Sequence, residues 1–383
     1  MHYLDNAATT FPKPQTVKQA VSAALEKYGA NPGRSGYPMS MATARELYEC
    51  RREADDFFHG YGPENVVFTS NCTMALNLVL KGWLRPGDHV VVSDLEHNAV
   101  MRPLEAMKER GISCTAAHVT IGDHDATVDA FRRALNGKTR LIVCTHASNV
   151  WGARLPVERI AAMAREYEIP VALDCAQSAG VLPIDMQDMG VDFLCIAGHK
   201  GLYGPMGTGL LLVNPARRLS TVIEGGTGSQ SVSLNQPEEL PDRLESGTVN
   251  VPGIIGLKAG IRFVRSRHGE IFRKETAYIQ TLYDRLSRIP QIVLYTPRPE
   301  PLYFVPVLSC NVKNVPSEEV GAQLARYGIA VRCGLHCAPA AHGAMGTLEQ
   351  GTIRMAPSVF SNIAEINTVY QGFLKIIHRN FAN

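Results

Sequence analysis

Between about residue 60 and residue 215, short apolar runs alternate with amphipathic stretches along the chain. The runs are rich in Val, Ile and Leu and do not alternate polar with apolar residues, which is typical of strands buried on both faces of a mainly parallel sheet. Stretches such as "TVDAFRRALNG" and "LPVERIAAMAREYE" predict the intervening helices, so the pattern indicates an α/β layered fold. The predicted strands lie in NVVFTS (65–70), DHVVVSDLEH (88–97), TRLIVCTHAS (139–148), IPVALDCAQS (169–178), DFLCIAGHK (192–200) and GTGLLLVN (207–214).

After about residue 260 the pattern changes to a second, smaller α+β arrangement. A helical stretch is followed by a predicted strand, "YFVPVLSCNV", and by a helix with Ser317 as its N-cap. Two more strand-like runs precede a final helix, where Asn362 and Glu365 predict a capping box. We therefore expect a large α/β domain at residues 15–260 and a small C-terminal domain at 261–383.

Residues 224–241, EGGTGSQSVSLNQPEELP, predict a long loop because they are rich in Gly, Ser and Asn. Loops of this length inside compact domains are usually functional or disordered. The loop lies shortly before the expected end of the large domain.

Composition and charge limit the classes of function. The 383 residues are 45% hydrophobic and 19% charged, the balance of a globular protein, and the net charge is +2. A nearly neutral chain is not expected to bind nucleic acid or an anionic membrane as its main partner. No apolar run approaches the ~20 residues needed to span a bilayer, and the N-terminus lacks the regions of a signal peptide.

The nine cysteines are scattered rather than spaced as a disulfide framework. An odd number in a long chain without an export signal favours free thiols in a reducing cytoplasm. Most are expected to be inert core residues, because free cysteine is among the most buried residue types. This expectation covers Cys50, Cys114, Cys144, Cys195 and Cys310.

Polar side chains recur where the predicted strands end. In an open parallel sheet, ligands bind at the carboxyl ends of the strands, so these side chains are expected to meet. Five strand ends finishing in groups suited to binding or proton transfer would be an odd accident. The groups are Thr73, Glu96, His97, Asn149, Asp174, Gln177, His199 and Lys200.

Lys200 and Asp174 suggest a specific chemistry. Lys200 follows one predicted strand and Asp174 ends the strand before it. A lysine that forms a Schiff base, with a carboxylate that keeps a pyridine nitrogen protonated, is the arrangement expected for pyridoxal phosphate. A solvated lysine and a surface carboxylate are the ordinary alternatives, and the shared layout disfavours them.

The same strand ends offer groups for a phosphate and for proton transfer. Thr73 opens a predicted helix, whose N-terminus would provide backbone N–H donors, and His199 could reach the same phosphate. His97 is either a core histidine or a group that stacks on a cofactor ring and moves protons, and its position favours the second.

The segment "IAVRCGLHCAPAAHG" (329–343) admits two interpretations. Cys333, His336, Cys337 and His342 could form a metal cluster, but their spacing matches no common zinc signature. The favoured interpretation is a reactive thiolate on a loop, made electropositive by Arg332 and two histidines. Close behind, Arg354 in "GTIRMAPS" suits a bidentate clamp on a substrate carboxylate.

Seven motifs together resemble the class V aminotransferase superfamily, and within it the group II cysteine desulfurases and selenocysteine lyases. They occur in the family's order from about residue 3 to the final helix. Each motif alone is weak, but the ordered set is highly specific. The motifs are YLDNAATTFPKP, EHNAV, THASNVWG, LDCAQSAG, GHKGLYGP, RLESGTVN and RCGLHCAP.

The resemblance implies a fold-type I pyridoxal-phosphate enzyme, a homodimer with each active site at the subunit interface and residues 1–14 packed near that site. Lys200 would carry the cofactor, Asp174 would pair with its pyridine nitrogen, and Cys337 would take sulfur from L-cysteine as a persulfide, leaving L-alanine. The resemblance assigns the remaining roles as follows: Gln177 to the ring hydroxyl, His97 to stacking on the ring, Thr73 and His199 to the phosphate, Thr248 to the partner subunit's phosphate, and Asn149 and Arg354 to the substrate carboxylate.

Several positions depart from the family pattern. Ala197 stands where many relatives have a phosphate-binding serine, and Cys72 replaces a hydroxyl residue at the start of the phosphate-binding helix. Cys333 is an additional thiol four residues before Cys337, and the two are hypothesised to form an inactivating disulfide. These departures leave the substrate and the sulfur acceptor, which is expected to be a protein, more open than the cofactor.

Three alternatives to a desulfurase remain. The first is a selenocysteine lyase that acts on L-selenocysteine through the same loop. The second is another pyridoxal-phosphate reaction, such as cleavage of a different thiol amino acid or transamination, which would need no cysteine nucleophile. The third is a scaffold without a cofactor that binds an iron–sulfur assembly partner. It would predict loss of Lys200 or Asp174, and both are present.

Overall fold

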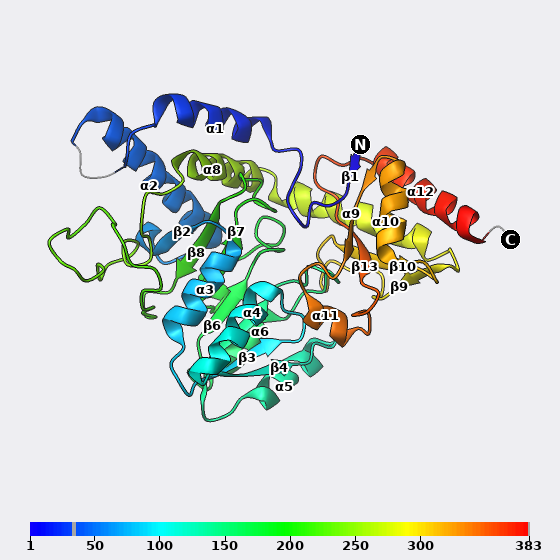
Figure 1. Cartoon of the computed structure of the whole chain (residues 1–383), viewed down its shortest axis with the longest axis horizontal. Helices are drawn as coiled ribbons and strands as arrows, with labels where there is room; N and C mark the ends of the chain where they lie inside the picture. Colours follow the sequence, from blue (N-terminus) through cyan, green and yellow to red (C-terminus); the bar gives the residue numbers. More distant parts are fainter. Residues whose placement is uncertain (33–35, 382–383) are drawn as a thin grey trace.

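The computed structural model describes residues 1–32 and 36–381 and is built around two sheets (Figure 1). The large sheet has seven strands in the order β2-β8-β7-β6-β5-β3-β4. Strands β3 to β7 are joined by parallel pairs, whereas β8 runs antiparallel to both β7 and β2. The strands are β2 (Val66–Thr69), β3 (His89–Ser93), β4 (Ser113–Ala117), β5 (Thr139–Thr145), β6 (Val171–Asp174), β7 (Phe193–Ala197) and β8 (Gly209–Val213).

All six strands predicted from apolar runs are present, and the mainly parallel sheet is confirmed. The sequence did not predict β4, an edge strand of sequence SCTAA in which most side chains are exposed or half-buried. An edge strand with few apolar side chains carries none of the signal that a buried strand carries.

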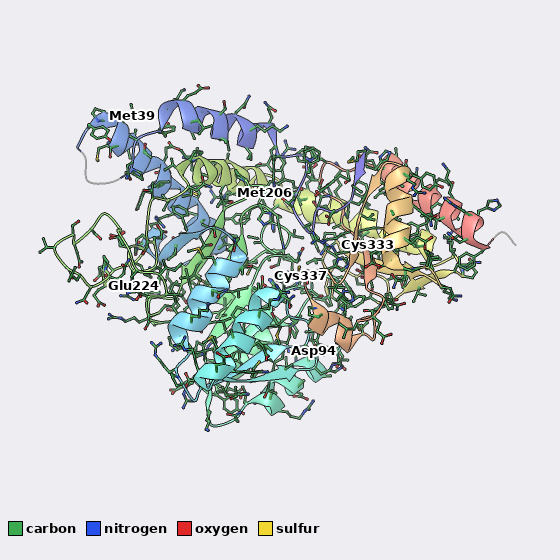
Figure 2. All side chains as sticks on the ribbon, in the orientation of Figure 1. Met39, Asp94, Met206, Glu224, Cys333 and Cys337 are labelled. Atoms are coloured by element: carbon green, nitrogen blue, oxygen red, sulfur yellow. The ribbon has the colours of Figure 1, made fainter. Side chains whose placement is uncertain are left out.

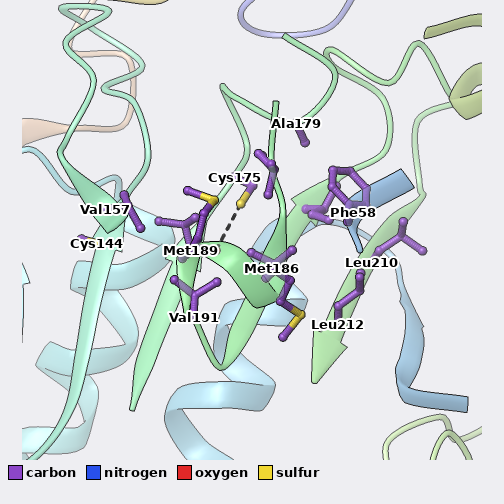
Figure 3. Close-up of a cluster of buried hydrophobic side chains, with 14 of the residues drawn as sticks. Phe58, Cys144, Val157, Cys175, Ala179, Met186, Met189, Val191, Leu210 and Leu212 are labelled. Carbon is purple, nitrogen blue, oxygen red and sulfur yellow. Dashed lines mark hydrogen bonds between the residues drawn. The ribbon is translucent and has the colours of Figure 1, made fainter. Parts of the chain in front are cut away.

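Helices cover both faces of the large sheet, so alternate side chains of each strand enter two different cores. One face packs against α3 (Cys72–Trp83) and α4 (Asn98–Met107). Figure 3 shows part of the other core, where Met186 and Met189 pack near Phe58 and Cys175. The helices on that face are α2 (Pro38–Phe58), α5 (His124–Ala134), α6 (Val157–Arg165), α7 (Met186–Met189) and α8 (Val251–Arg265).

The second sheet is antiparallel, with the strand order β12-β13-β10-β9. It forms its own core with α9, α10 and α12. The predicted boundary near residue 260 falls inside α8 and stays a prediction. The elements are α9 (His268–Leu286), β9 (Ile292–Leu294), β10 (Leu308–Val312), α10 (Ser317–Arg326), β12 (Arg332–Gly334), α11 (Pro339–Ala344), β13 (Thr352–Met355) and α12 (Ile363–Phe381).

The first residues of the chain belong spatially to its last third. Strand β1 (His2–Tyr3) pairs in parallel with β11 (Ile329–Ala330), and Figure 1 shows β1 beside the C-terminal elements. The chain then crosses to the large sheet, where α1 (Gln15–Lys27) packs on α8. Residues 4–14 therefore pass between the two sheets.

The local predictions had mixed outcomes. The capping box is confirmed, because Asn362 Oδ1 accepts from the Glu365 N–H at 3.0 Å and Glu365 Oε2 accepts from the Asn362 N–H at 3.2 Å. Ser317 as an N-cap is wrong: Pro316 precedes the helix, and the Ser317 hydroxyl donates to the Gln350 carbonyl.

Residues 224–241 contain no helix or strand, as predicted, and project from the molecule as a green loop in Figure 1. Within residues 1–32 and 36–381, no helix combines the length and apolar character needed to cross a membrane. The expectation of free thiols is confirmed for all nine cysteines, and the five expected in the core are buried, except Cys114, which is half-buried.

Candidate active site

A cavity lies at the carboxyl ends of the parallel strands. Its empty volume of about 480 Å³ is in the range of ligand pockets, about 300–1,000 Å³. The predicted site residues Cys72, Thr73, His97, Asn149, Asp174, Gln177, His199 and Lys200 all line it. Asn71, Ala99, Thr145, Ala176 and Ala197 complete its wall.

Lys200 lies three residues beyond the end of β7, where the chain leaves the sheet. Burial lowers the pKa of the Lys200 ammonium, while the nearby Asp174 opposes the shift. The Thr10 hydroxyl donates to the Lys200 carbonyl at 3.0 Å, which ties the backbone of the lysine to the N-terminal segment.

Asp174 is the last residue of β6 and is 4% exposed. Its Oδ1 accepts from the Ala176 N–H at 2.8 Å and from the Cys72 thiol at 3.3 Å. The Cys72 thiol is also 3.3 Å from the Cys195 carbonyl, and burial raises its pKa well above the usual range. Cys72 is therefore a protonated donor that orients the Asp174 carboxylate.

His97 is the N-cap of α4, and its Nδ1 accepts from the Ala99 N–H at 2.9 Å. This bond leaves Nε2 as the protonated nitrogen of the neutral ring. Burial lowers the pKa of His97, so the neutral ring is the main form at neutral pH.

His199 is held through its backbone while its ring stays unsatisfied. The His199 carbonyl accepts from the Lys13 ammonium at 2.8 Å and from the Thr9 and Thr10 hydroxyls at 3.1 and 3.2 Å. The ring Nδ1 is buried and has no hydrogen-bond partner among the described residues. Burial lowers the pKa of His199 to about 4, so the ring is neutral at neutral pH.

The N-terminal segment contacts the cavity at further points. Gln177 Nε2 donates to the Ala7 carbonyl at 3.0 Å, which commits one of its N–H groups and leaves its Oε1 free to accept. Burial lowers the pKa of the Lys13 ammonium to about 8, so Lys13 is still mainly charged at neutral pH.

Asn149 and Arg354 form one hydrogen-bonded group with Asp5. Arg354 lies in β13 and is 3% exposed, its Nη1 donates to the Asn149 carbonyl at 3.0 Å, and its Nη2 donates to Asp5 Oδ1 at 3.0 Å. The Asn149 amide donates to the His336 carbonyl at 2.8 Å. Arg354 is hydrogen-bonded to Asn149, which lines the cavity, but Arg354 does not line the cavity itself.

Cys337 is an exposed thiol on the loop between β12 and α11. Its φ of 57° and the φ of 50° at His336 are left-handed values that non-glycine residues rarely adopt. The Cys337 carbonyl accepts from the Asn98 N–H at 2.8 Å, which places the loop against the start of α4, next to His97. The loop therefore brings a thiol from the small sheet to the edge of the large one.

The expectation that two histidines make this loop electropositive was wrong. Burial lowers the pKa of His336 to about 2 and that of His342 to about 4, so these histidines are uncharged at neutral pH and supply no positive field. Arg332 is the remaining cation of the expected group.

Cys333 does not face Cys337. Its thiol packs against Gly321 of α10, where a Cβ would lie 2.3 Å from the sulfur, and it belongs to the small core. Figure 2 shows Cys333 among the C-terminal elements and Cys337 nearer the large sheet. This orientation does not support the hypothesised disulfide. Among the described residues, no group of three or more His, Cys, Asp or Glu side chains is placed to hold a metal ion.

Thr248 is apart from the other predicted site residues. It is exposed and lines a different hollow, together with Arg51, Gly226 and Asp242. The structure thus does not bring Thr248 to the cavity of its own chain.

Thr145 and Asp5 were not predicted as site residues, and Glu96 was named only among the strand-end groups, without a role. Glu96 is fully buried and accepts from the Ser93 hydroxyl at 2.6 Å and from the Thr145 N–H at 2.7 Å. Thr145 lines the cavity, and Asp5 pairs with Arg354. Glu96 and Thr145 stand at strand ends and carried a positional signal, whereas Asp5 carried none.

The chain was compared with known proteins. Residues 2–369 match the aminotransferase class-V family. A probable cysteine desulfurase of Methanothermobacter thermautotrophicus is 33% identical over 380 residues, covering 95% of this chain and 92% of the relative. A cysteine desulfurase of Salmonella agona is 33% identical over 346 residues, covering 88% and 84%.

Solved structures agree with the sequence comparison. The apo cysteine desulfurase of Thermococcus onnurineus superimposes with a TM-score of 0.91 at 29% identity, covering 98% of this chain and 94% of that one. The cysteine desulfurase CsdA of Escherichia coli gives a TM-score of 0.86 at 25% identity. With its family match, its relatives and its fold in agreement, the chain belongs to the aminotransferase class-V family.

Proposed function

We propose that this protein is a pyridoxal-phosphate-dependent cysteine desulfurase, which converts L-cysteine to L-alanine and takes the sulfur onto Cys337. The observation that carries the proposal is the position of Cys337, an exposed thiol hydrogen-bonded through its carbonyl to Asn98, beside His97 of the cavity. The relatives named cysteine desulfurase support the same activity.

The residues of the cavity suit pyridoxal phosphate. Lys200 would hold the cofactor covalently, and Asp174, oriented by two donors, would pair with the pyridine nitrogen. Gln177 would contact the ring hydroxyl through its free Oε1, and His97 would stack on the ring. When bound, the cofactor supplies an electron sink for the substrate's α-carbon.

The phosphate would lie at the N-terminus of α3, where Thr73 and Cys72 stand in the first turn. The neutral His199 ring can present its buried, unpartnered Nδ1 as an N–H donor to a phosphate oxygen. Thr248 would serve the phosphate of a second copy, which is consistent with its separation from its own cavity and implies a homodimer.

Substrate binding and proton transfer are assigned to groups around the cavity. Arg354 and Asn149 would hold the α-carboxylate. Lys200 would take the α-proton, because burial lowers its pKa and makes its neutral, basic form more accessible. His97, predicted as the alternative base, has its Nδ1 bonded to the Ala99 N–H and its Nε2 protonated, so it would act as a hydrogen-bond donor instead.

The sulfur step balances with groups of this chain. The Cys337 thiolate attacks the substrate sulfur, a sulfur–sulfur bond forms, and the carbon–sulfur bond breaks. The carbon keeps the electron pair of that bond and takes a proton, which gives the methyl group of alanine. The persulfide on the exposed Cys337 would then pass to an acceptor protein, in a cytoplasm suited to nine free thiols.

The test is a paired assay on purified protein with a reductant. L-cysteine or L-selenocysteine is supplied, and alanine is quantified together with sulfide or selenide. The variants are Cys337→Ala and, as the matched control, Cys333→Ala, whose thiol faces the small core. Alanine from L-cysteine that is abolished by Cys337→Ala and kept by Cys333→Ala would establish the proposal. Alanine from L-selenocysteine alone would assign a selenocysteine lyase, and no alanine from either would reject both.

A further inference from the structure

Arg354 already has a counter-ion in the structure. Asp5 Oδ1 lies 3.0 Å from Arg354 Nη2, and the two side chains are 20% and 4% exposed. A buried guanidinium without a carboxylate partner is costly, so this pair stabilises the charged arginine inside the protein. Asp5 therefore already occupies one side of the guanidinium group that would also attract a substrate carboxylate.

Hydrogen bonds of the neighbouring residues fix the position of Asp5. Asp5 forms a parallel bridge with Ala356, two residues beyond Arg354. The Ala356 N–H donates to the Leu4 carbonyl at 2.7 Å, and the Asn6 amide donates to the Ala356 carbonyl at 2.9 Å. Leu4 and Asn6, on either side of Asp5, are thus hydrogen-bonded to Ala356, the residue that follows β13.

The pair leaves Arg354 able to bind a second acceptor. Nη1 and Nη2 each have one contact, to Asn149 and Asp5, while the buried Nε has none among the described residues. A guanidinium group presents more N–H donors than these two contacts use. A substrate carboxylate can therefore be received by the free donors, but it must approach a charge that Asp5 has already neutralised.

We propose that Asp5 is a positioning residue that weakens the hold of Arg354 on the α-carboxylate; this inference rests on the proposed function. L-cysteine and L-alanine carry the same α-carboxylate, so tight binding at Arg354 would retain the product as well as the substrate. The Asp5 carboxylate partly neutralises the guanidinium charge. It thereby fixes the orientation of Arg354 and keeps the affinity for L-alanine low enough for the product to dissociate.

The experiment measures ligand binding rather than turnover. L-alanine is titrated into the cofactor-loaded protein, and the change in absorbance of the Lys200-linked cofactor gives the Kd. Ethylamine, which has the amine but no carboxylate, is titrated in parallel. The variants are Asp5→Asn, which keeps an oxygen acceptor but removes the charge, and Asp5→Ser as a second neutral variant. Asp129→Asn, an exposed residue of α5, is the matched control.

We expect Asp5→Asn to lower the Kd for L-alanine about tenfold, the scale of one nearby charge at an effective dielectric between protein and water. Asp5→Ser should shift it in the same direction, and the Kd for ethylamine should not change in either variant. An unchanged or raised Kd for L-alanine in both variants, or an equal shift for ethylamine, would overturn the role of Asp5 alone. If the unsubstituted protein bound neither ligand, the proposed function itself would fail.

Discussion

Two cysteines of the same chain, Cys72 in the cavity wall and Cys337 on a loop next to His97, lie in contrasting surroundings. Cys72 is buried at the start of α3, gives its S–H to Asp174, and has a pKa raised by burial. Cys337 is exposed on a loop, and only its backbone carbonyl is bonded to the large sheet's helices. Cys72 is kept protonated as a donor to Asp174, whereas Cys337 is exposed and is the thiol proposed to react.

The surrounding backbones differ in the same way. Asp174 ends strand β6, and Lys200 follows strand β7, in a closely packed sheet that fixes both positions. His336 and Cys337 hold left-handed conformations that cost on the order of 1–3 kcal/mol each. Two hydrogen bonds to their carbonyls, from Asn149 and Asn98, oppose that cost. The side proposed to hold the cofactor is thus fixed by the fold, and the loop of the proposed nucleophile by a few hydrogen bonds.

The largest effect should come from the rigid side. Lys200→Ala removes the group assigned to the cofactor and to proton transfer, so alanine formation should fall by about 10³-fold or more. The protein should also lose the visible absorbance of the lysine-linked cofactor. Lys18→Ala, an exposed residue of α1, is the control. Normal turnover by Lys200→Ala would reject the assignment of the site.

The loop should respond to loss of one bond. Asn149→Ala leaves the buried His336 carbonyl without its 2.8 Å donor, at a cost of about 1–3 kcal/mol. Alanine formation should fall about tenfold or more, and amide hydrogen exchange at residues 335–338 should become faster. Asn380→Ala removes a similar 2.8 Å bond at the far end of α12 and should change neither. Unchanged exchange in Asn149→Ala would show that the loop is held by other means.

Beneath the site, Glu96 should shape the pH dependence of stability. Burial raises the pKa of Glu96 from 4.5 to about 8, so the folded protein holds a proton that the unfolded chain releases in between. The stability that this proton provides is complete below pH 4.5 and is lost as the pH rises toward 8.

Glu96→Gln should remove that loss, because the amide cannot ionise and still accepts from Thr145. The free energy of unfolding, measured by urea titration, should exceed that of the unsubstituted protein by a few kcal/mol at pH 8, on the order set by the shifted pKa. At pH 4.5 the difference should be small. Glu109→Gln, exposed in the 3₁₀ turn Lys108–Arg110, should show neither effect. Parallel pH curves for Glu96→Gln and the unsubstituted protein would contradict the prediction.

The smallest effect should come from Cys72. Cys72→Ser keeps a donor to Asp174, so activity should stay within about threefold. The same substitution at Cys337 should abolish activity, because a hydroxyl cannot accept sulfur as a persulfide. The alanine assay on both variants compares the two cysteines directly. Equal losses would mean that the two thiols do not differ as their surroundings indicate.

The positions of Asp174 and Lys200 in the cavity could be predicted from sequence, because strand ends are local features. Asp174 and Lys200 follow apolar runs directly, and the geometry of a parallel sheet brings such ends together. The thiol loop was found through its motif, but its charge was misjudged: burial of His336 and His342 depends on packing, which residue type alone does not show.

The pairing of Asp5 with Arg354 could not be predicted, although residues 1–14 were expected to pack near the site. Its partner Arg354 is 349 residues away along the chain, and their contact depends on β1 pairing with β11. β4 was missed for a different reason, since a strand with one covered edge needs few apolar side chains. A contact between residues far apart in the chain and a strand with few apolar side chains are thus the two features that the sequence did not predict.

The pairing of the N-terminal segment with the C-terminal sheet also bears on how the protein is made. Asn6 must wait for Ala356, which is 350 residues downstream, before their hydrogen bond can form. At typical rates of about 5–20 residues per second, synthesis separates the two by tens of seconds. Strands of the large sheet can assemble during that interval, but Arg354 cannot receive Asp5 until nearly the whole chain has left the ribosome. A nascent or truncated chain therefore lacks the Asp5–Arg354 pair beside the proposed cofactor pocket, so only a finished chain can have the complete site.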